Sequence, residues 1–267
     1  MGPETDRPAY DSMMQAESGL MSITGVEAAP QCASASPSPT SAPGCTRPRP
    51  SWRPPLEREL GDRTDQKLGV SLFDGQVAWI SYMASSYFAT GQPPGRMGSK
   101  HPSLAPYQAF ETPDGYVLVA TASEHLWPTF SRAIDQPDLV EDERVATTAD
   151  RVANRADLDP TLAAEFEQYS TAEAVGELEA AGVPVSRVHE MAEVFEHRQV
   201  QARDMHRSVD HPTVGRVEMP GSPMHFSKTP TSIDRHPPLL GEHTEEILRE
   251  VGYDRETIAL LADRDVV

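Results

Sequence analysis

The sequence predicts a mixed α/β or α+β fold, and three observations support this expectation. Apolar residues recur at helical spacing in several segments, the longest covering residues 74–90. Two pairs of short apolar runs joined by turn residues predict β-hairpins. The chain contains no internal repeat. Its 267 residues are enough for one large domain or two modest ones.

The acidic composition excludes several kinds of partner. The chain has 41 acidic and 23 basic residues, with a formal charge of -18. Nucleic-acid phosphates require a Lys/Arg surface, so we expect no nucleic-acid partner and no anionic membrane surface. No window of the sequence is apolar enough for a membrane span. Two cysteines, Cys32 and Cys45, cannot build a metal site or a disulfide framework, and a cytoplasmic location is the default expectation.

The first predicted helix covers residues 10–25. Asp11 or Ser12 can cap its start, and the final Thr-Gly pair is a stop signal. Gly19 weakens the helix interior, which predicts that its missing side chain has a packing reason.

The composition changes abruptly in residues 28–55. No acidic residue occurs between Glu27 and Glu57, and eight prolines fall within residues 30–55. Taken alone, this segment predicts a disordered linker. A linker of that length is unusual inside a compact domain.

Order returns at Leu56 with a helix end and a polar turn. A long helix follows at 74–90, capped by Asp74, and its charge-free body predicts burial between layers or against a partner subunit. Residues 91–102 are too rich in Pro and Gly to be anything but a loop. Strands at 107–111 and 116–122 form a hairpin around the Asp114-Gly115 turn.

The remainder alternates helices with short strands. Ser170 and Glu173 are capping residues that open one helix, and Gly182 closes it before a short buried strand at 183–188. A second hairpin pairs residues 206–210 with 215–219. Further helices are predicted at 123–134, 150–154, 158–169, 191–196, 200–203, 242–251 and 254–262.

Five blocks, in order, resemble the family III CoA-transferases (the CaiB/BaiF family), which include formyl-CoA transferase, the carnitine CoA-transferases and α-methylacyl-CoA racemase. The blocks are RPAYDSMMQAESGLMSITG, SLFDGQVAWISYMASSYFATGQPPGRMGSKHPSLAPYQAFETPDGYV, RVANRADL, LEAAGVPVSRVHEMAEVFEHRQVQARDM and PPLLGEHTEEILREVGY. Together they cover almost the whole chain except residues 28–55.

The resemblance implies an α/β fold with a partial Rossmann-like large domain, a smaller α+β domain and an interlocked homodimer. Residues 1–27 would be a remnant of the large domain, 56–99 its long helix and loop, 100–205 the small domain and 206–267 the return to the large domain. Residues 28–55 would be an aberrant, disordered segment. Family members extend further at the N-terminus, so the resemblance also implies a truncated chain that lacks most of the CoA-binding residues.

The family reaction moves coenzyme A from a thioester to a carboxylic acid. A carboxylate nucleophile attacks the thioester, forms a mixed anhydride, becomes an enzyme–CoA thioester and passes coenzyme A to the acceptor acid. Backbone N–H groups hold the oxyanions, and a glycine-rich loop excludes water. The implied partners are an acyl-CoA and a carboxylic acid; no cofactor is expected, because the coenzyme A thioester is a substrate.

The nucleophilic aspartate of the family is absent where the resemblance places it, near Pro39 and Thr40. Codons compatible with residues 31–46, read two bases along, encode VRIGVPITDLGAGMY, which matches the family pattern. We therefore hypothesise a frameshift restored just before Leu56; the gene's bases test it. The alternative is a genuine disordered insertion.

Other candidate active-site residues also come from the resemblance. Tyr10 matches a tyrosine of the transferases that is histidine in the racemase; alternatively it packs the helix start. Gln15 matches a polar active-site position; alternatively it lies on a solvated helix face. A loop that would fold over the active site, or serve as an ordinary connector, supplies Gly95, Gly98, Lys100 and His101. Glu242-His243 lacks a second histidine at helical spacing and is interpreted as a helix start.

The function implied is acyl-CoA:carboxylate CoA transfer, with this particular chain expected to be inactive because the nucleophile is missing. A non-catalytic pseudogene product or dimerising scaffold is one alternative. An isomerase like α-methylacyl-CoA racemase is another, disfavoured by Tyr10.

Overall fold

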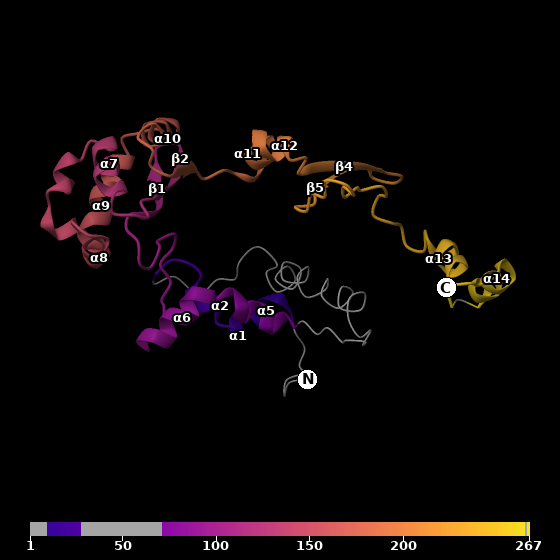
Figure 1. The fold of residues 1–267 in the computed structure, drawn as a ribbon. Helices are drawn as coiled ribbons and strands as arrows, with labels where there is room; N and C mark the ends of the chain where they lie inside the picture. The colour runs from indigo at the N-terminus through magenta and orange to yellow at the C-terminus, as the bar shows by residue number, and fades with distance from the viewer. Residues whose placement is uncertain (1–9, 28–70, 265) are drawn as a thin grey trace. The chain divides into compact units, whose positions relative to one another are not determined.

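The computed structural model describes residues 10–27, 71–264 and 266–267, which fall into two compact units that divide after Val188 (Figure 1). Both units mix helices and strands, which confirms the predicted fold class. The Pro/Ser-rich segment, the turn that follows it and the expected nucleophile position lie outside the described residues. The finer domain boundaries drawn from the sequence stay predictions.

The first predicted helix is divided in two, α1 (Asp11–Glu17) and α2 (Leu20–Ile23). Gly19 lies between them with φ +83°, and a Cβ at this position would come no closer than 3.9 Å to its nearest neighbour, Ser22 Oγ. The glycine is therefore required by its left-handed backbone and not by packing, so the packing prediction was wrong. The capping prediction was also wrong, because Tyr10 occupies the N-cap and makes no side-chain capping bond.

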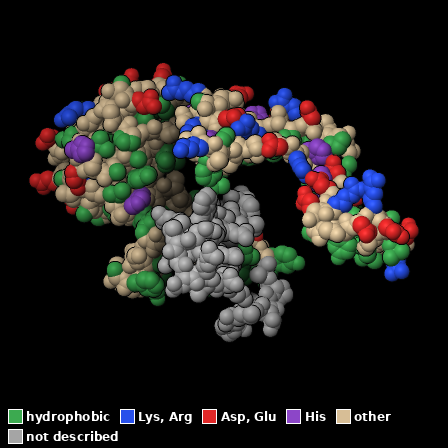
Figure 2. All heavy atoms as spheres, turned by 45° about the vertical axis from the view of Figure 1, so that its right-hand side comes forward, with side chains coloured by type: hydrophobic (Ala, Val, Ile, Leu, Met, Phe, Trp, Pro, Cys, Tyr) green, Lys and Arg blue, Asp and Glu red, His purple; other side chains and the backbone are tan. Residues whose placement is uncertain are grey.

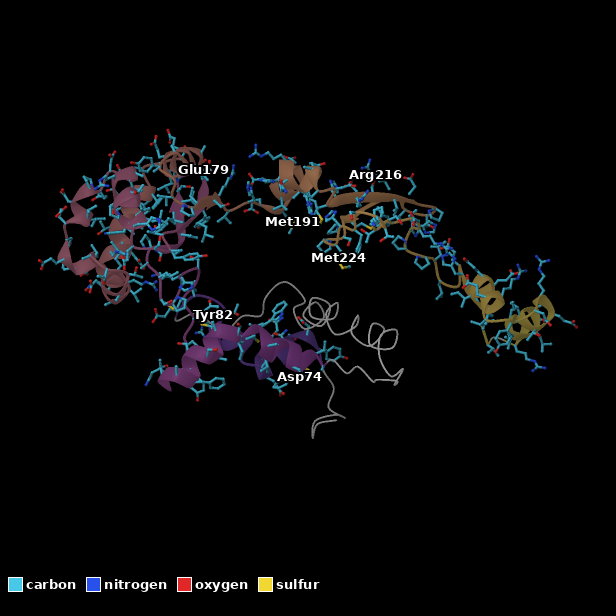
Figure 3. The ribbon with its side chains drawn as sticks, in the orientation of Figure 1. Asp74, Tyr82, Glu179, Met191, Arg216 and Met224 are labelled. Atoms are coloured by element: carbon cyan, nitrogen blue, oxygen red, sulfur yellow. The ribbon has the colours of Figure 1, made fainter. Side chains whose placement is uncertain are left out.

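The long apolar helix is likewise interrupted, into α5 (Leu72–Trp79) and α6 (Ser81–Thr90), with Ser81 at φ 27°. Figure 3 labels Asp74 on α5 and Tyr82 on α6. Ser71 caps α5 by accepting a hydrogen bond from the Asp74 N–H at 3.0 Å, so the cap is Ser71 and not Asp74 as predicted. Helix α1 packs against α5.

The described residues do not bury the large apolar side chains of this helical pair. Phe88 is 80% exposed, and Tyr82 is 56% exposed. The described part of the chain therefore leaves a surface of large apolar side chains on α5 and α6 uncovered, and burial against a partner subunit stays a prediction.

A three-stranded antiparallel sheet in the order β1-β2-β3 forms the centre of the first unit. Strands β1 (Tyr107–Thr112) and β2 (Gly115–Ala120) form the predicted hairpin, with Thr112 opposite Gly115 across the turn. Strand β3 (Val185–Arg187) pairs with β2. Ser186 and Arg187 are exposed, so the predicted burial of this strand was wrong; it lies at the sheet edge, and the buried valine of that segment is Val183.

Helices pack around this sheet and bury one hydrophobic core. Its aromatic centre is the stack of Phe110 on Phe166, with ring centroids 4.5 Å apart, continued by Phe130 and Trp127. The helices are α7 (Leu126–Ala133), η1 (Pro137–Val140), η2 (Glu143–Val145), α8 (Thr148–Ala153), α9 (Arg155–Phe166) and α10 (Thr171–Ala180).

The predicted capping box at the start of α10 is confirmed. Ser170 accepts from the Glu173 N–H, and the Glu173 carboxylate accepts from the Ser170 N–H. Asp114, in the hairpin turn, accepts from the Thr171 N–H at 2.7 Å and from its hydroxyl at 2.8 Å. These bonds lower the pKa of Asp114, and they tie the hairpin to the helix.

The second unit contains α11 (Met191–Glu196), α12 (Arg198–Ala202), the predicted hairpin of β4 (His206–His211) and β5 (Gly215–Pro220), α13 (Thr244–Glu250) and α14 (Arg255–Asp263). Figure 2 shows charged side chains of both signs interspersed over it. Its ion pairs include Arg207–Asp204 at 2.6 Å and Arg235–Glu246 at 2.9 Å. His243 is the N-cap of α13, as expected for a helix start.

Candidate functional site

The glycine-bearing loop, residues 91–102, is attached to the turn that follows α2. The Gly98 N–H donates to the Gly25 carbonyl at 2.9 Å, and Arg96 Nε donates to the Val26 carbonyl at 3.3 Å. Gly98 has φ +64°, and a Cβ there would lie 3.3 Å from Val26 Cγ1. Glycine is thus needed at this position for both its backbone and its close approach. The loop reaches the chain just before the segment where the family nucleophile is expected.

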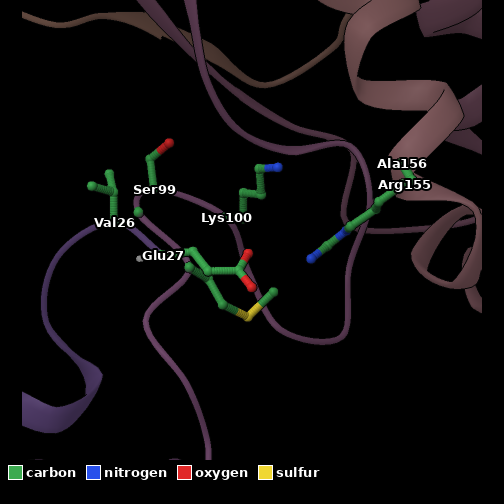
Figure 4. A pocket seen from close by; sticks show the side chains of 8 residues that line it. Val26, Glu27, Ser99, Lys100, Arg155 and Ala156 are labelled. Atoms are coloured by element: carbon green, nitrogen blue, oxygen red, sulfur yellow. The ribbon is translucent and has the colours of Figure 1, made fainter. Parts of the chain in front are cut away.

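A cavity of about 580 Å³ lies beside this attachment (Figure 4). That volume is within the usual range for small-molecule sites. The wall combines the loop, the turn after α2 and the start of α9. Its lining residues in the described part of the chain are Val26, Glu27, Met97, Gly98, Ser99, Lys100, Arg155 and Ala156.

Arg155 joins the loop to α9. Its Nη2 donates to the carbonyl of His101 at 2.5 Å and to that of Leu104. The Nε and Nη1 atoms are buried and have no hydrogen-bond partner among the described residues. Burial lowers the pKa of this guanidinium, and the negative charge of Asp159 opposes that effect.

Lys100 pairs with the same aspartate. Lys100 Nζ lies 2.7 Å from Asp159 Oδ2, and the lysine side chain is 42% exposed while the aspartate side chain is 11% exposed. In Figure 4 the Arg155 and Glu27 side chains point toward each other, and the Lys100 amine points away from Glu27. The lining of the cavity therefore includes two cations, Lys100 and Arg155, and one carboxylate, Glu27, whereas Asp159 pairs with Lys100 without being one of the lining residues.

The other predicted loop residues do not line the cavity. His101 stacks against Tyr82, with ring centroids 6.1 Å apart, and against Tyr107 at 5.2 Å, while its Nδ1 accepts from the Ser103 N–H. These contacts give the imidazole a structural role in holding the loop on α6 and β1. Gly95 has open space around it and shows no left-handed backbone.

Tyr10 and Gln15 also lie outside the cavity lining. Tyr10 is 72% exposed. Gln15 is fully buried and donates from Nε2 to Asp11 Oδ2 at 2.8 Å, so the alternative of a solvated helix face was wrong. Gln76 of α5 is fully buried too, and neither atom of its amide has a hydrogen-bond partner in the described part of the chain. The roles of Tyr10 and Gln15 toward a substrate stay predictions.

Sequence reasoning missed three charged residues of the cavity region: Glu27, Arg155 and Asp159. The block RVANRADL contains Arg155, and Asp159 follows at the i,i+4 spacing of ion pairs on a helix. That spacing was the available signal, but nothing local indicated that Lys100 joins them. Within the described residues, no group of three His, Cys, Asp or Glu side chains could hold a metal ion.

None of the helices in the described part of the chain combines the length and apolar character needed to cross a bilayer.

Comparison with known proteins places these features in a family context. A sequence model described as CoA-transferase family III matches residues 1–244. The human protein named succinyl-CoA:glutarate CoA-transferase is 34% identical over all of this chain and 61% of its own length. Acetyl-CoA:oxalate CoA-transferase of Acetobacter aceti is 30% identical over 85% of this chain and 57% of its own length. A crystal structure of a CAIB/BAIF family protein from Brucella suis matches with TM-score 0.78 and 30% identity, over 94% of this chain and 65% of that one. The chain thus spans about three fifths of the length of these curated relatives.

Proposed function

The chain belongs to CoA-transferase family III, and from that membership we propose that its reaction by descent is coenzyme A transfer from an acyl-CoA thioester to a carboxylic acid. In this reaction an enzyme carboxylate attacks the thioester carbonyl and releases the CoA thiolate as a mixed anhydride forms. The thiolate attacks the enzyme acyl carbon, which frees the donor acid and gives an enzyme–CoA thioester. The acceptor carboxylate then attacks this enzyme–CoA thioester, which releases the CoA thiolate and forms a second mixed anhydride. The thiolate attacks the acyl carbon of the acceptor, which frees the enzyme carboxylate and gives the new acyl-CoA.

The acceptor in this proposal is a dicarboxylic acid. The relatives named for glutarate and oxalate support that substrate class, because both acids carry two carboxylates.

We further propose that this polypeptide does not carry out the transfer itself. The observation behind this proposal is the sequence between Glu27 and Glu57, which contains no carboxylate to act as nucleophile. Without an enzyme carboxylate, neither the mixed anhydride nor the enzyme–CoA thioester can form. The frameshift hypothesis supplies a cause, and sequencing of the gene in the second reading frame tests that cause separately.

The assay incubates the purified chain with succinyl-CoA and glutarate and separates the CoA esters by liquid chromatography. The human relative named for this reaction serves as the positive control. We expect no glutaryl-CoA and no covalent CoA adduct in the intact mass of the chain. Glutaryl-CoA formed above the level of a heat-denatured sample would refute the proposed inactivity.

A second candidate function is a non-catalytic, dimerising scaffold, favoured by the apolar surface of α5 and α6 that the described residues leave uncovered. A groove of about 480 Å³ lies along this surface, lined in part by Ile23, Ile80, Met83, Tyr87 and Phe88. Light scattering during size-exclusion chromatography, combined with a CoA-thioester binding assay, separates the candidates. A folded dimer that ignores CoA thioesters supports the scaffold, and an aggregate supports the pseudogene product.

A racemase activity and a cytoplasmic location complete the proposals drawn from the sequence. Tyr10 in place of histidine argues against racemisation, and exchange of an α-proton into deuterated solvent would reverse that view. Cell fractionation tests the location.

A further inference from the structure

The carboxylate of Asp159 on α9 is shielded from water, and it accepts no hydrogen bond in the described part of the chain. Two cations balance its charge. Lys100 Nζ lies 2.7 Å from Asp159 Oδ2, and the charge of Arg155, one turn earlier on α9, interacts with the same carboxylate. A charge shielded from water is costly unless it is paired, so Asp159 depends on these cations.

The two cations come from different elements. Arg155 belongs to the same helix as Asp159, whereas Lys100 belongs to the glycine-bearing loop. The Lys100 side chain is 42% exposed and the Asp159 side chain only 11%. Breaking this ion pair therefore costs the lysine little, because water solvates it, and costs the aspartate much more.

The same ion pair joins two parts of the cavity wall, because the loop and the start of α9 both supply lining residues. The loop is attached to α9 at a second point, where Arg155 Nη2 donates to the carbonyls of His101 and Leu104. Both attachments lie on the side of the helix that carries Asp159. Water that returns to an unpaired Asp159 would therefore have to enter between the loop and the helix.

We propose that Lys100 and Asp159 form an electrostatic latch that holds the glycine-bearing loop closed on α9, and that loss of the Lys100 charge opens the cavity wall between them. The unpaired Asp159 carboxylate regains water by separating the loop from the helix. Neutralising Asp159 as well removes the need for that water, so the loop closes again. The latch acts on the wall whether or not this chain transfers coenzyme A.

Amide hydrogen exchange of the full chain, resolved to single residues by NMR, measures this opening. The reporters are Gly98 and His101, whose N–H groups each donate to a backbone carbonyl at 2.9 Å. Val117 and Val119 in β2 are fully buried and report unfolding of the whole unit. Circular dichroism checks that each variant folds.

Three variants separate charge from packing. Lys100→Met removes the charge of the loop and keeps most of the side-chain volume. Asp159→Asn removes the shielded charge, and the third variant carries both changes. The matched controls are Lys228→Met in the second unit and Asp157→Asn on an exposed position of α9.

We expect exchange at Gly98 and His101 to accelerate at least about tenfold in Lys100→Met, because Asp159 is left unpaired. Asp159→Asn should accelerate it by less than about threefold, since water then solvates the lysine. The double variant should behave like Asp159→Asn, so that the second change suppresses the first. Both controls should keep native exchange, and the two β2 amides should do so in every variant.

Three results would overturn the latch. Native exchange at both reporters in Lys100→Met would mean that Asp159 does not need the lysine. Acceleration in the double variant as large as in Lys100→Met would mean that the lysine acts through packing. Equal acceleration at Val117 and Val119 would mean general destabilisation of the unit. Should Lys100→Met fail to fold, Lys100→Gln removes the same charge and is judged by the same three results.

Discussion

The Arg151 side chain of α8 hydrogen-bonds to several separate segments of the first unit, and its removal should destabilise that unit severely. The side chain is fully buried. Nε donates to the Ala105 carbonyl at 2.8 Å, and Nη1 donates to the carbonyls of Val145 and Ala146 at 3.0 and 3.1 Å. Nη2 donates to Glu124 Oε2 at 2.8 Å.

Truncation to Met at position 151 leaves these three carbonyls without their guanidinium donors, at roughly 1 kcal/mol each as a lower bound. The guanidinium also lies 4.7 Å from the centre of the Trp127 ring, a cation–π contact for which about 1 kcal/mol is again a lower bound. Loss of the ion pair with Glu124 adds little to the destabilisation, because the Glu124 side chain is 58% exposed and its carboxylate is solvated by water instead. The total is about 4 kcal/mol, a large part of the roughly 5–15 kcal/mol that stabilises a typical domain.

Hydrogen exchange measured by mass spectrometry on peptides of β1, β2 and α7 reports the free energy of unfolding of this unit without assuming that both units unfold together. Arg151→Met should lower protection of these peptides by about 4 kcal/mol. Arg151→Lys should recover less than half, since one ammonium group cannot reach acceptors spread around a planar guanidinium.

The surface control Arg132→Met should change protection by no more than about 0.5 kcal/mol. A loss below about 1 kcal/mol for Arg151→Met would refute the reasoning, because it would mean that water or backbone shifts satisfy the three carbonyls.

The remaining predictions concern pH, the loop and a helix cap. The Thr148 N–H and Arg151 lower the pKa of Glu124 to about 2 from 4.5. The contribution of the Glu124 carboxylate to the free energy of unfolding is therefore complete above pH 4.5 and is lost as pH falls toward 2. Glu124→Gln should remove about 1 kcal/mol of this acid sensitivity, measured by urea unfolding across pH. Gly98→Ala should weaken the loop attachment by about 1 kcal/mol, seen as faster hydrogen exchange in residues 95–101, because Gly98 has a left-handed backbone. The control Gly95→Ala should leave the exchange unchanged, and equal effects of the two variants would contradict the role given to the positive φ of Gly98. Ser71→Ala should destabilise α5 by about 1 kcal/mol and Asp74→Asn by less, as judged by helical circular dichroism; the reverse order would restore Asp74 as the cap.

Local signals in the sequence predicted much of the fold correctly. The hairpin at the Asp114-Gly115 turn, the capping box of Ser170 and Glu173, and the hairpin of β4 and β5 all lie where expected. Each depends on residues within a few positions of one another, where turn and cap chemistry decides the backbone.

Predictions that depended on the surroundings of a residue were less successful. Gly19 and Ser81 interrupt helices whose apolar pattern runs through both positions. Burial of Gln15 and exposure of β3 depend on which element packs on each face, and helical or strand period alone does not report this.

The sequence by itself determined the family, through five blocks in order, and it showed that the stretch where a nucleophilic carboxylate is expected contains none. Only the tertiary structure brought Lys100, Arg155 and Glu27 to one cavity and showed which donors of Arg155 have no partner among the described residues. These three residues lie far apart along the chain and belong to a loop, a helix start and a turn. Their meeting depends on how the loop attaches to the turn after α2 and to α9, which long-range packing and hydrogen bonds decide.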